Sequence, residues 1–225
     1  MTCSLEYQIG RTSKFPMMLT FASALIVSYL LGSIPAGYLA GRLAGLDIRK
    51  AGSGNIGATN VMRVLGKAYG YPVFAIDFLK GLAAVSVSIL IARHTQLPEK
   101  WMELIGIVAA VSCVTGHVFP VWLQFKGGKG VATSAGALFG LMPVALLIGA
   151  AVWIAMFQVT RYVSVASITA AIALPIVILI MISLDQARTM ALLYFSICLA
   201  AMVILRHRSN LSRLVRGTEP RFKRK

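Results

Sequence analysis

The chain has 225 residues, of which 58% are hydrophobic and 13% are charged, and its mean hydropathy is +0.79. A water-soluble domain of this composition would have too little polar surface to cover its apolar core, so we expect the bilayer to be its solvent. The 22 Lys and Arg outnumber the seven Asp and Glu, giving a formal net charge of +15. In so apolar a chain, this charge indicates an anionic membrane surface rather than nucleic acid.

The chain begins with a polar stretch, residues 1–17, ahead of the first apolar run. We expect a disordered tail or a misplaced start codon there, in preference to an ordered extracytoplasmic tail. We expect no cleavable signal, because the following apolar run is long and lacks a clear small-residue cleavage site. Cys3, Cys113 and Cys198 are an odd number without metal-type spacing. They predict neither a disulfide framework nor a zinc site.

Apolar runs occupy most of the remaining chain and predict about seven membrane-spanning helices. Most have the roughly 20 residues that a ~30 Å hydrocarbon core requires. The fourth reaches only about 20 Å at ~1.5 Å per residue, so we expect either a short helix supported by its neighbours or half of a re-entrant element. The predicted spans are 18–43, 70–92, 103–122, 130–142, 143–160, 162–183 and 187–205.

The basic residues favour one orientation of these spans. If the loop at 44–69 is cytoplasmic, seven spans place sixteen Lys and Arg on that side and five on the other. A six-span count would put the C-terminal tail outside and break this bias. We therefore predict an all-α polytopic membrane domain over 18–205, with an extracytoplasmic N-terminus and a basic cytoplasmic tail at 206–225.

Two features inside the spans suggest how the helices pack. Ser33 and the three glycines that follow at four-residue intervals form a small-residue stripe, which we interpret as packing within the monomer in preference to dimerisation. Asp77 and Lys80 are three residues apart in the second span, where ionisable groups are costly unless paired or functional. A neutralising pair and a direct role both remain open for them.

The first polar segment, residues 49–63, contains a formal G-x-G-x-x-G pattern. No strand precedes it, so it is weak as a dinucleotide site. Consecutive glycine backbones nevertheless expose N–H groups that can hold a phosphate, and neighbouring polar side chains add donors. A flexible loop that caps the next helix is the alternative. The candidate ligands are Gly52, Ser53, Gly54, Asn55, Gly57, Thr59, Asn60 and Arg63.

The second polar segment, residues 116–133, interleaves lysines with glycines at the mouth of a predicted helix. This pattern indicates an anion-binding site. It is not a Walker A loop, because a glycine stands where Ser or Thr should follow the lysine. The histidine in this segment is either a ligand or a hydrogen-bonded packing residue. The candidates are His117, Lys126, Gly127, Gly128, Lys129 and Gly130.

The third polar segment, residues 206–219, follows the last span. A basic tail of this kind typically holds anionic headgroups. In addition, His207, Asn210 and Arg213 fall at i, i+3 and i+6, so a helix would display them along one side. Glu219 and Asp47 are the two carboxylates on this side. They are isolated in sequence, which argues against a Mg²⁺ site.

Together the three segments resemble the motifs of the bacterial acyl-phosphate-dependent glycerol-3-phosphate acyltransferase family. The similarity covers about 18–222, and the N-terminal extension and very basic end depart from it. The matching motifs are Gly52–Asn60 with Arg63, Gly116–Pro120 with Phe125–Thr133, and Arg206–Leu214 with Gly217–Glu219.

The resemblance implies transfer of an acyl group from acyl phosphate to the sn-1 hydroxyl of glycerol 3-phosphate, with lysophosphatidic acid and phosphate as products. It also implies a location in the bacterial cytoplasmic membrane, with the active face towards the cytoplasm, and no cofactor. Because acyl phosphate is already activated, the protein need mainly orient the reactants and stabilise developing charge. No covalent enzyme intermediate is required.

The same resemblance implies a role for each candidate. One group, with His207 or the substrate's phosphate taking the hydroxyl proton, holds glycerol 3-phosphate: Ser53, Arg63, His207 and Asn210. A second group holds acyl phosphate: Lys126, Lys129 and the amides of Gly127, Gly128 and Gly130. His117 is assigned as a further donor and Glu219 as an orienting residue.

Two other functions compete with this interpretation. A transporter of a phosphorylated solute would show internal repeats and binding groups near the midplane, and neither pattern is visible. A lipid-binding scaffold would explain the basic tail but not the glycine-rich loops. The choice of acyl phosphate over acyl-CoA rests on the resemblance alone, and monomer and homodimer both remain open.

Overall fold

The computed structural model describes residues 2–185 and 189–222, with side chains from Phe15 onward, and its regular elements in these ranges are helices. The long helices are α1 (Thr2–Gly32), α4 (Lys67–His94), α5 (Met102–Val118), α7 (Pro143–Thr160), α8 (Val163–Ser183) and α9 (Met190–Arg206). The shorter helices are α2 (Ala36–Leu43), α3 (Ala58–Leu65), α6 (Val131–Leu141) and α10 (Arg208–Val215). Three 3₁₀ turns complete the set: η1 (Ile48–Lys50), η2 (Glu99–Trp101) and η3 (Val121–Leu123).

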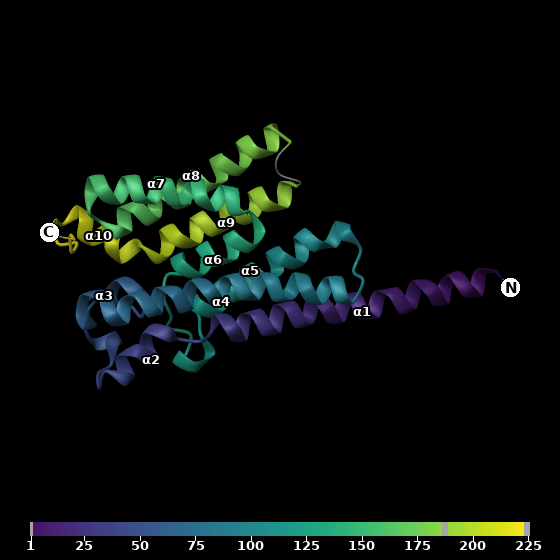
Figure 1. The fold of residues 1–225 in the computed structure, drawn as a ribbon, viewed down its shortest axis with the longest axis horizontal. Helices are drawn as coiled ribbons and strands as arrows, with labels where there is room; N and C mark the ends of the chain where they lie inside the picture. The colour runs from purple at the N-terminus through teal and green to yellow at the C-terminus, as the bar shows by residue number, and fades with distance from the viewer. Residues whose placement is uncertain (1, 186–188, 223–225) are drawn as a thin grey trace.

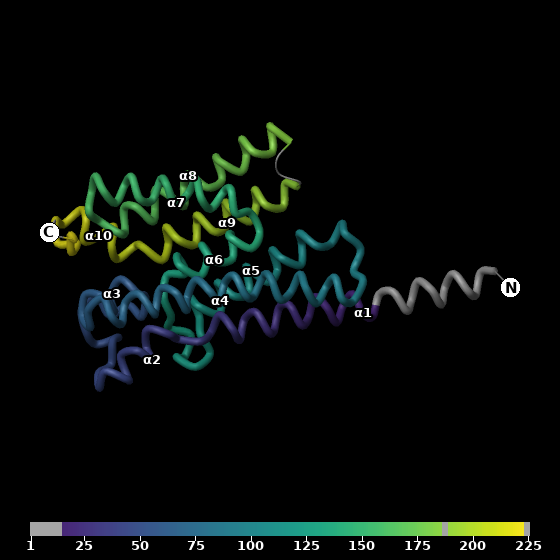
Figure 2. The backbone as a smooth tube through the Cα atoms, viewed as in Figure 1, coloured from purple at the N-terminus to yellow at the C-terminus, as the bar shows by residue number. Residues whose placement is uncertain are grey.

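The long helices lie side by side along one direction, and α2, α3 and α10 gather at the end that carries the C-terminus (Figure 1). Within the bundle, α1 packs on α5, α4 on α6, and α8 on both α7 and α9. Because α5 contacts α9 and α6 contacts α7, these two pairs join the α1–α6 group to the α7–α9 group. Figure 2 lets the chain be followed through the turns at both ends.

The predicted all-α membrane architecture is confirmed. Among the described residues, five helical spans are long and apolar enough to cross a bilayer, and the pair α9 and α10, bent by 53°, makes up to six. The fourth predicted span forms α6, whose 11 residues reach only about 16 Å at ~1.5 Å each. It packs against α4 and α5, as expected for a short helix supported by its neighbours. Part of the predicted 187–205 span, residues 187–188, lies outside the described residues.

The first predicted span forms one candidate membrane span, Phe15–Leu43, with a local interruption between α1 and α2. The break lies at Ser33–Pro35, where Pro35 stands at the start of α2 and has no N–H to continue the hydrogen-bond ladder. Upstream, the stretch that we expected to be a tail is helical, because α1 begins at Thr2 and includes Pro16. One proline removes one helical hydrogen bond and can leave the rest of a helix intact.

Glycines let the helix backbones approach closely inside the monomer. A Cβ added to Gly32 would lie 2.0 Å from the carbonyl oxygen of Cys113, and one on Gly37 would lie 1.7 Å from that of Ile56. The stripe predicted from Ser33 onward therefore includes a close packing contact within the chain. Its last member, Gly45, has nothing within 4 Å of such an atom.

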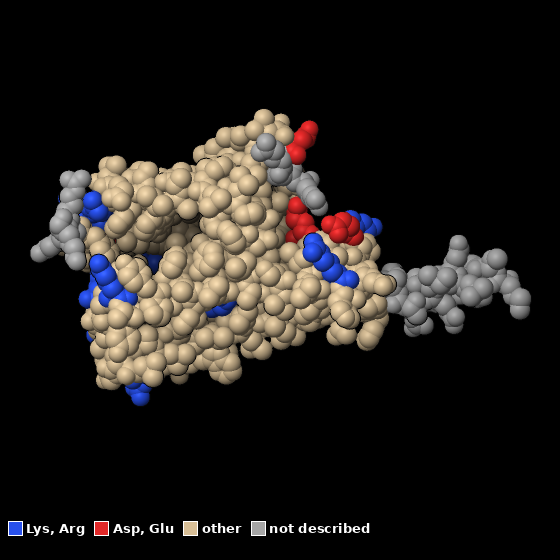
Figure 3. Space-filling model, in the orientation of Figure 1, with Lys and Arg blue, Asp and Glu red and all other residues tan. Residues whose placement is uncertain are grey.

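Charged side chains separate between the two ends of the bundle. In Figure 3, Lys and Arg lie at the end of α10 and the C-terminus, while Asp and Glu lie with further Lys and Arg at the opposite end. The long surface between them carries few charged side chains, which matches a bilayer core flanked by two polar faces.

Candidate active site

The three polar segments meet at one end of the bundle, around a cavity of about 120 Å³. A single ordered water needs roughly 10–15 Å³, so this space admits a larger polar ligand. Two cationic side chains and no carboxylate are among the residues that line it, which suits an anionic ligand. The lining residues are Ser53, Gly54, Asn55, Gly127, Lys129, Ser209 and Arg213.

Asn60 organises the first loop from beneath it. Its Oδ1 accepts a hydrogen bond from the Ser53 N–H at 2.8 Å, and its Nδ2 donates to the carbonyls of Asn55 at 2.8 Å and Ala51 at 3.1 Å. Asn60 is buried, and its polar groups are already used by these bonds. The structure therefore does not support Asn60 as a substrate ligand: it shapes the loop that carries Ser53.

The glycines of this loop serve its backbone turns. Gly52 and Gly54 have φ of +59° and +72°, a region that residues with a Cβ rarely adopt. The N–H of Gly57 donates to Asn55 Oδ1 at 2.7 Å, so it is not free for a ligand. Of the predicted residues in this loop, Ser53, Gly54 and Asn55 reach the cavity wall.

The second loop is held flat against the end of α5. The N–H of Gly127 donates to the carbonyl of Val118, and that of Gly128 to the carbonyl of His117, each at 3.1 Å. The prediction that these two amides form an anion-binding site is therefore not supported, because both donors are already engaged within the protein. The cationic group that this loop presents at the cavity is the Lys129 ammonium.

Arg206 fastens the same loop from the other side. Its guanidinium donates to the carbonyls of Gly127 and Gly128 at 3.0–3.2 Å. Gly130, with φ of +81°, turns the chain into α6. Lys126 is exposed and does not line the cavity.

Lys129 joins the second loop to α10 through a polar network. Its Nζ donates to Asn210 Oδ1, and Asn210 Nδ2 donates to Glu219 Oε1 at 2.6 Å. Glu219 also accepts from Arg213 Nε at 2.8 Å and from Ser164 Oγ at 3.0 Å. Glu219 thus orients Asn210 and Arg213, which in turn flank Lys129 and the cavity.

Burial and charge shift the pKa values of this network. Burial lowers the pKa of Lys129 to about 8, although the nearby Glu219 carboxylate opposes the shift. Burial alone would raise the pKa of Glu219, but hydrogen bonds from Asn210, Arg213 and Ser164 lower it overall. Near neutral pH the site therefore holds a charged lysine and an ionised glutamate.

Arg63 lies beside the network rather than on the cavity wall. Its guanidinium donates to the carbonyl of Pro220 at 3.1 Å and lies 5.0 Å from the ring centre of Phe222. The charges of Glu219 and Arg213 are close enough to influence its pKa, which burial lowers. Thr59 is partly buried and does not line the cavity.

Both predicted histidines are buried away from the wall. His207 stands at the bend between α9 and α10, and its Nδ1 donates to the carbonyl of Val203 at 2.8 Å. The neutral ring therefore keeps Nε2 as its acceptor. His117 lies beneath the second loop, in contact with Asp77.

Sequence reasoning missed two of the lining residues. Arg213 appeared only as the third member of the i, i+3, i+6 pattern with His207 and Asn210, and α10 does display it at the cavity. Ser209 follows no recognisable pattern. Within the described residues, no three His, Cys, Asp or Glu side chains gather so that they could hold a metal ion.

The sequence model of the glycerol-3-phosphate acyltransferase family matches residues 22–217. The chain belongs to this family. The glycerol-3-phosphate acyltransferase of Geotalea daltonii is 46% identical over 200 residues, covering 89% of this chain and 96% of the relative. That of Synechococcus elongatus is 47% identical over 207 residues, covering 92% and 96%.

Two solved structures of an acyltransferase share the fold. The crystal structure of PlsY, an integral membrane glycerol 3-phosphate acyltransferase, in its glycerol 3-phosphate form has a TM-score of 0.78 and 41% identity, covering 90% of this chain and 96% of PlsY. Its lysophosphatidic acid form has a TM-score of 0.75, also at 41% identity. The chain is therefore a member of a family of integral membrane glycerol-3-phosphate acyltransferases.

Proposed function

We propose that this acyltransferase moves a fatty acyl group from acyl phosphate to the sn-1 hydroxyl of glycerol 3-phosphate, giving lysophosphatidic acid and inorganic phosphate. The observation that carries the proposal is the cavity where all three motifs meet, with Lys129 and Arg213 on its wall. Both proposed substrates carry a phosphate, and the two cations come from different elements, so each can serve a different phosphate.

The reaction needs orientation and charge stabilisation more than a protein nucleophile. The sn-1 oxygen attacks the acyl carbonyl carbon, a new C–O bond forms, and the bond from that carbon to the phosphate oxygen breaks. The departing phosphate takes the negative charge, which Lys129 stabilises. Because His207 is buried off the cavity wall, we assign the hydroxyl proton to a phosphate oxygen of the substrates.

The remaining motif residues support this arrangement. Ser53 lines the cavity, where its hydroxyl can donate to glycerol 3-phosphate. Asn210 is buried beside Lys129 and accepts a hydrogen bond from its ammonium, so it serves the substrates by fixing that group. Arg63, held in place by the Pro220 carbonyl and the Phe222 ring, adds positive charge beside the cavity and attracts a phosphate from there. The face in Figure 3 is hollowed between the α7–α9 group and α4, and this hollow offers the acyl chain a path along the bundle.

We also propose that the site end faces the cytoplasm of a bacterium, with α6 counted as a seventh, short crossing. The excess of Lys and Arg at that end supports this orientation. Glycerol 3-phosphate and phosphate are water-soluble, so a site at this face needs no transport step for either.

Reconstitution tests the acyl donor. Purified protein in vesicles is given labelled glycerol 3-phosphate with acyl phosphate, acyl-CoA or acyl carrier protein in turn. We expect labelled lysophosphatidic acid from acyl phosphate alone. Product from acyl-CoA but not from acyl phosphate would overturn the donor assignment.

Two variants test the residue assignments in the same assay. Lys129→Ala and Arg63→Ala should each lower turnover by about a hundredfold or more, because each removes a charge that the transition state needs. Wild-type turnover in either variant would show that the residue has no part in the reaction. Uptake of glycerol 3-phosphate into sealed vesicles tests the transporter alternative. Equal uptake with and without the protein would argue against it.

A further inference from the structure

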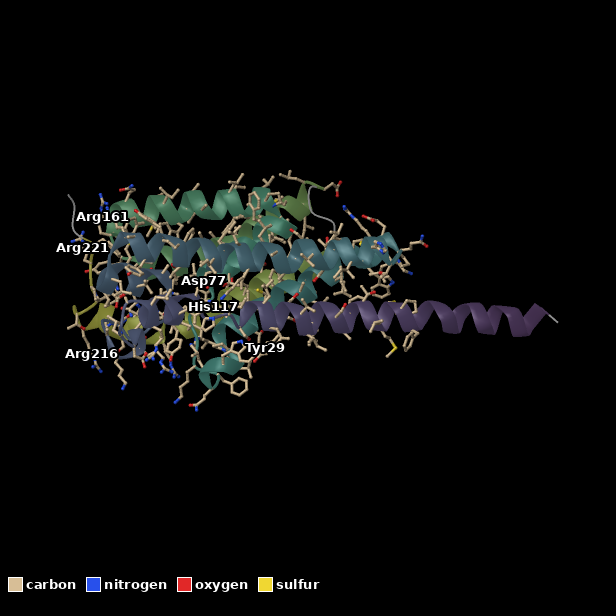
Figure 4. All side chains as sticks on the ribbon, turned by 60° about the horizontal axis from the view of Figure 1, so that its bottom comes forward. Tyr29, Asp77, His117, Arg161, Arg216 and Arg221 are labelled. Atoms are coloured by element: carbon tan, nitrogen blue, oxygen red, sulfur yellow. The ribbon has the colours of Figure 1, made fainter. Side chains whose placement is uncertain are left out.

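Below the second loop, three ionisable side chains lie inside the bundle and off the cavity wall. Asp77 and Lys80 come from α4 and His117 from α5, and all three are buried. Asp77 Oδ1 lies 2.8 Å from Lys80 Nζ and 3.4 Å from His117 Nδ1. Figure 4 shows Asp77 and His117 beside each other in the interior. Such groups are costly in a membrane and are retained when paired or functional.

Lys80 connects this cluster, through helix α2, to the first loop of the site. Its Nζ donates to the carbonyl of Ile34 at 2.9 Å, at the break between α1 and α2 where the helical hydrogen bonds stop. Helix α2 in turn supports the first loop, because Gly37 packs directly against the carbonyl of Ile56. A shift at Lys80 would therefore reach the loop that carries Ser53.

His117 connects the cluster to the second loop. Its Nδ1 faces Asp77, while its Nε2 lies under Gly128, so that a Cβ on Gly128 would lie only 2.2 Å from this nitrogen. The neighbouring residue is Lys129. The imidazole ring therefore spans the distance from α4 to the loop that presents the ammonium.

We propose that Asp77, Lys80 and His117 are positioning residues for acyl transfer. They fix the position of the second loop, and so of Lys129, relative to the first loop and α10. They do not touch the substrates. This changes His117 from a ligand to a support and gives the Asp77–Lys80 pair a role. The inference rests on the proposed function only in taking Lys129 as a phosphate ligand.

A pair of variants separates support from direct contact. Gly128→Ala places a methyl group against the His117 ring and displaces the loop. We therefore expect kcat/KM for the acyl donor to fall about tenfold to a hundredfold, mainly through a higher KM for that substrate. His117→Asn keeps a nitrogen facing Asp77 but removes the atoms beneath Gly128. The double variant should therefore recover most of the lost kcat/KM. A double variant no better than Gly128→Ala alone would overturn the proposal.

Two matched glycine substitutions control the experiment. A Cβ on Gly127 would meet the backbone carbonyls of His117 and Val118, at 2.2 and 2.7 Å, so His117→Asn should not rescue Gly127→Ala. Gly149→Ala in α7, where nothing lies within 4 Å, should behave like the wild type. Rescue of Gly127→Ala by His117→Asn would also contradict the proposal, because it would not depend on the ring.

Folding is measured alongside activity for each variant. The thermal midpoint in detergent should change little where only KM rises. If Gly128→Ala does not fold, recovery of monodisperse protein in the double variant supports the proposal, and failure to recover it contradicts the proposal. The assay uses whichever acyl donor supports turnover, so an error in the donor assignment leaves this outcome readable.

Discussion

At the scale of single residues, Lys129 combines exposure to the cavity with a shifted pKa. Its side chain lines the cavity, yet burial lowers its pKa to about 8. Below this pH the amine is protonated and attracts phosphate, and as the pH rises through about 8 the free enzyme loses the charge. The phosphate itself stays dianionic above its second pKa near 6, so the change belongs to the lysine.

The expected result is a fall in kcat/KM of about tenfold per pH unit above pH 8, because this ratio reports ionisations of the free enzyme. Lys129→Arg keeps its charge to far higher pH and should remove the fall, whatever its effect on the maximum rate. A kinetic profile from pH 6.5 to 9.5 checks both proteins. The same alkaline fall in the arginine variant would rule out Lys129 as its source.

At the scale of elements, the first loop depends on a single buried amide. Asn60→Ala would leave the Ser53 N–H and three backbone carbonyls without their partner. An unsatisfied buried group costs about 1–3 kcal/mol, so we expect a lower thermal midpoint together with lower activity. Thr59→Ala, one residue earlier on α3, should change the midpoint little. Equal effects of the two would show that the amide does not support the loop.

The C-terminal segment is the second element that supports the site. Phe222 lies between Arg63 on α3 and Phe157 on α7, with ring centres of Phe157 and Phe222 5.8 Å apart. Its N–H donates to the carbonyl of Arg161 at 3.1 Å. The segment therefore joins the α1–α6 group to the α7–α9 group beside the cavity.

Removing this ring should disturb Arg63 without removing it. A cation–π contact at an exposed site contributes about 0.5–1 kcal/mol, so Phe222→Ala should raise KM for glycerol 3-phosphate a few fold with kcat nearly retained. Phe222→Tyr keeps the ring and should behave like the wild type. Steady-state kinetics with glycerol 3-phosphate varied distinguishes the two, and a matching loss in Phe222→Tyr would contradict a role for the ring face.

At the scale of the whole molecule, the two ends of the bundle should lie on opposite sides of the membrane. Ser212 on α10 and Ser183 at the end of α8 are both exposed, at the site end and the far end respectively. In a variant with the three native cysteines replaced, Ser212→Cys should react with an impermeant maleimide only after the cells are opened, and Ser183→Cys in intact cells. The reverse pattern would invert the proposed orientation.

Much of this architecture could be predicted from the sequence, because membrane helices obey local rules. Apolar runs of sufficient length, a short fourth run and one-sided basic loops predicted the helices and brought the three motifs together. The i, i+3, i+6 spacing meant that a helix would display His207, Asn210 and Arg213 along one side. Helix α10 carries Asn210 and Arg213, whereas His207 stands at the bend before it.

Only the tertiary structure decided which motif residues reach the cavity. Groups that look alike in sequence differ in whether the folded chain already engages them. The Gly128 amide is bonded to the His117 carbonyl, and Asn60 is bonded to four backbone groups. Lys129 faces the cavity because Arg206 and His117 hold its loop from two sides. Local patterns predict which groups could bind phosphate, whereas long-range hydrogen bonding decides which remain available for it.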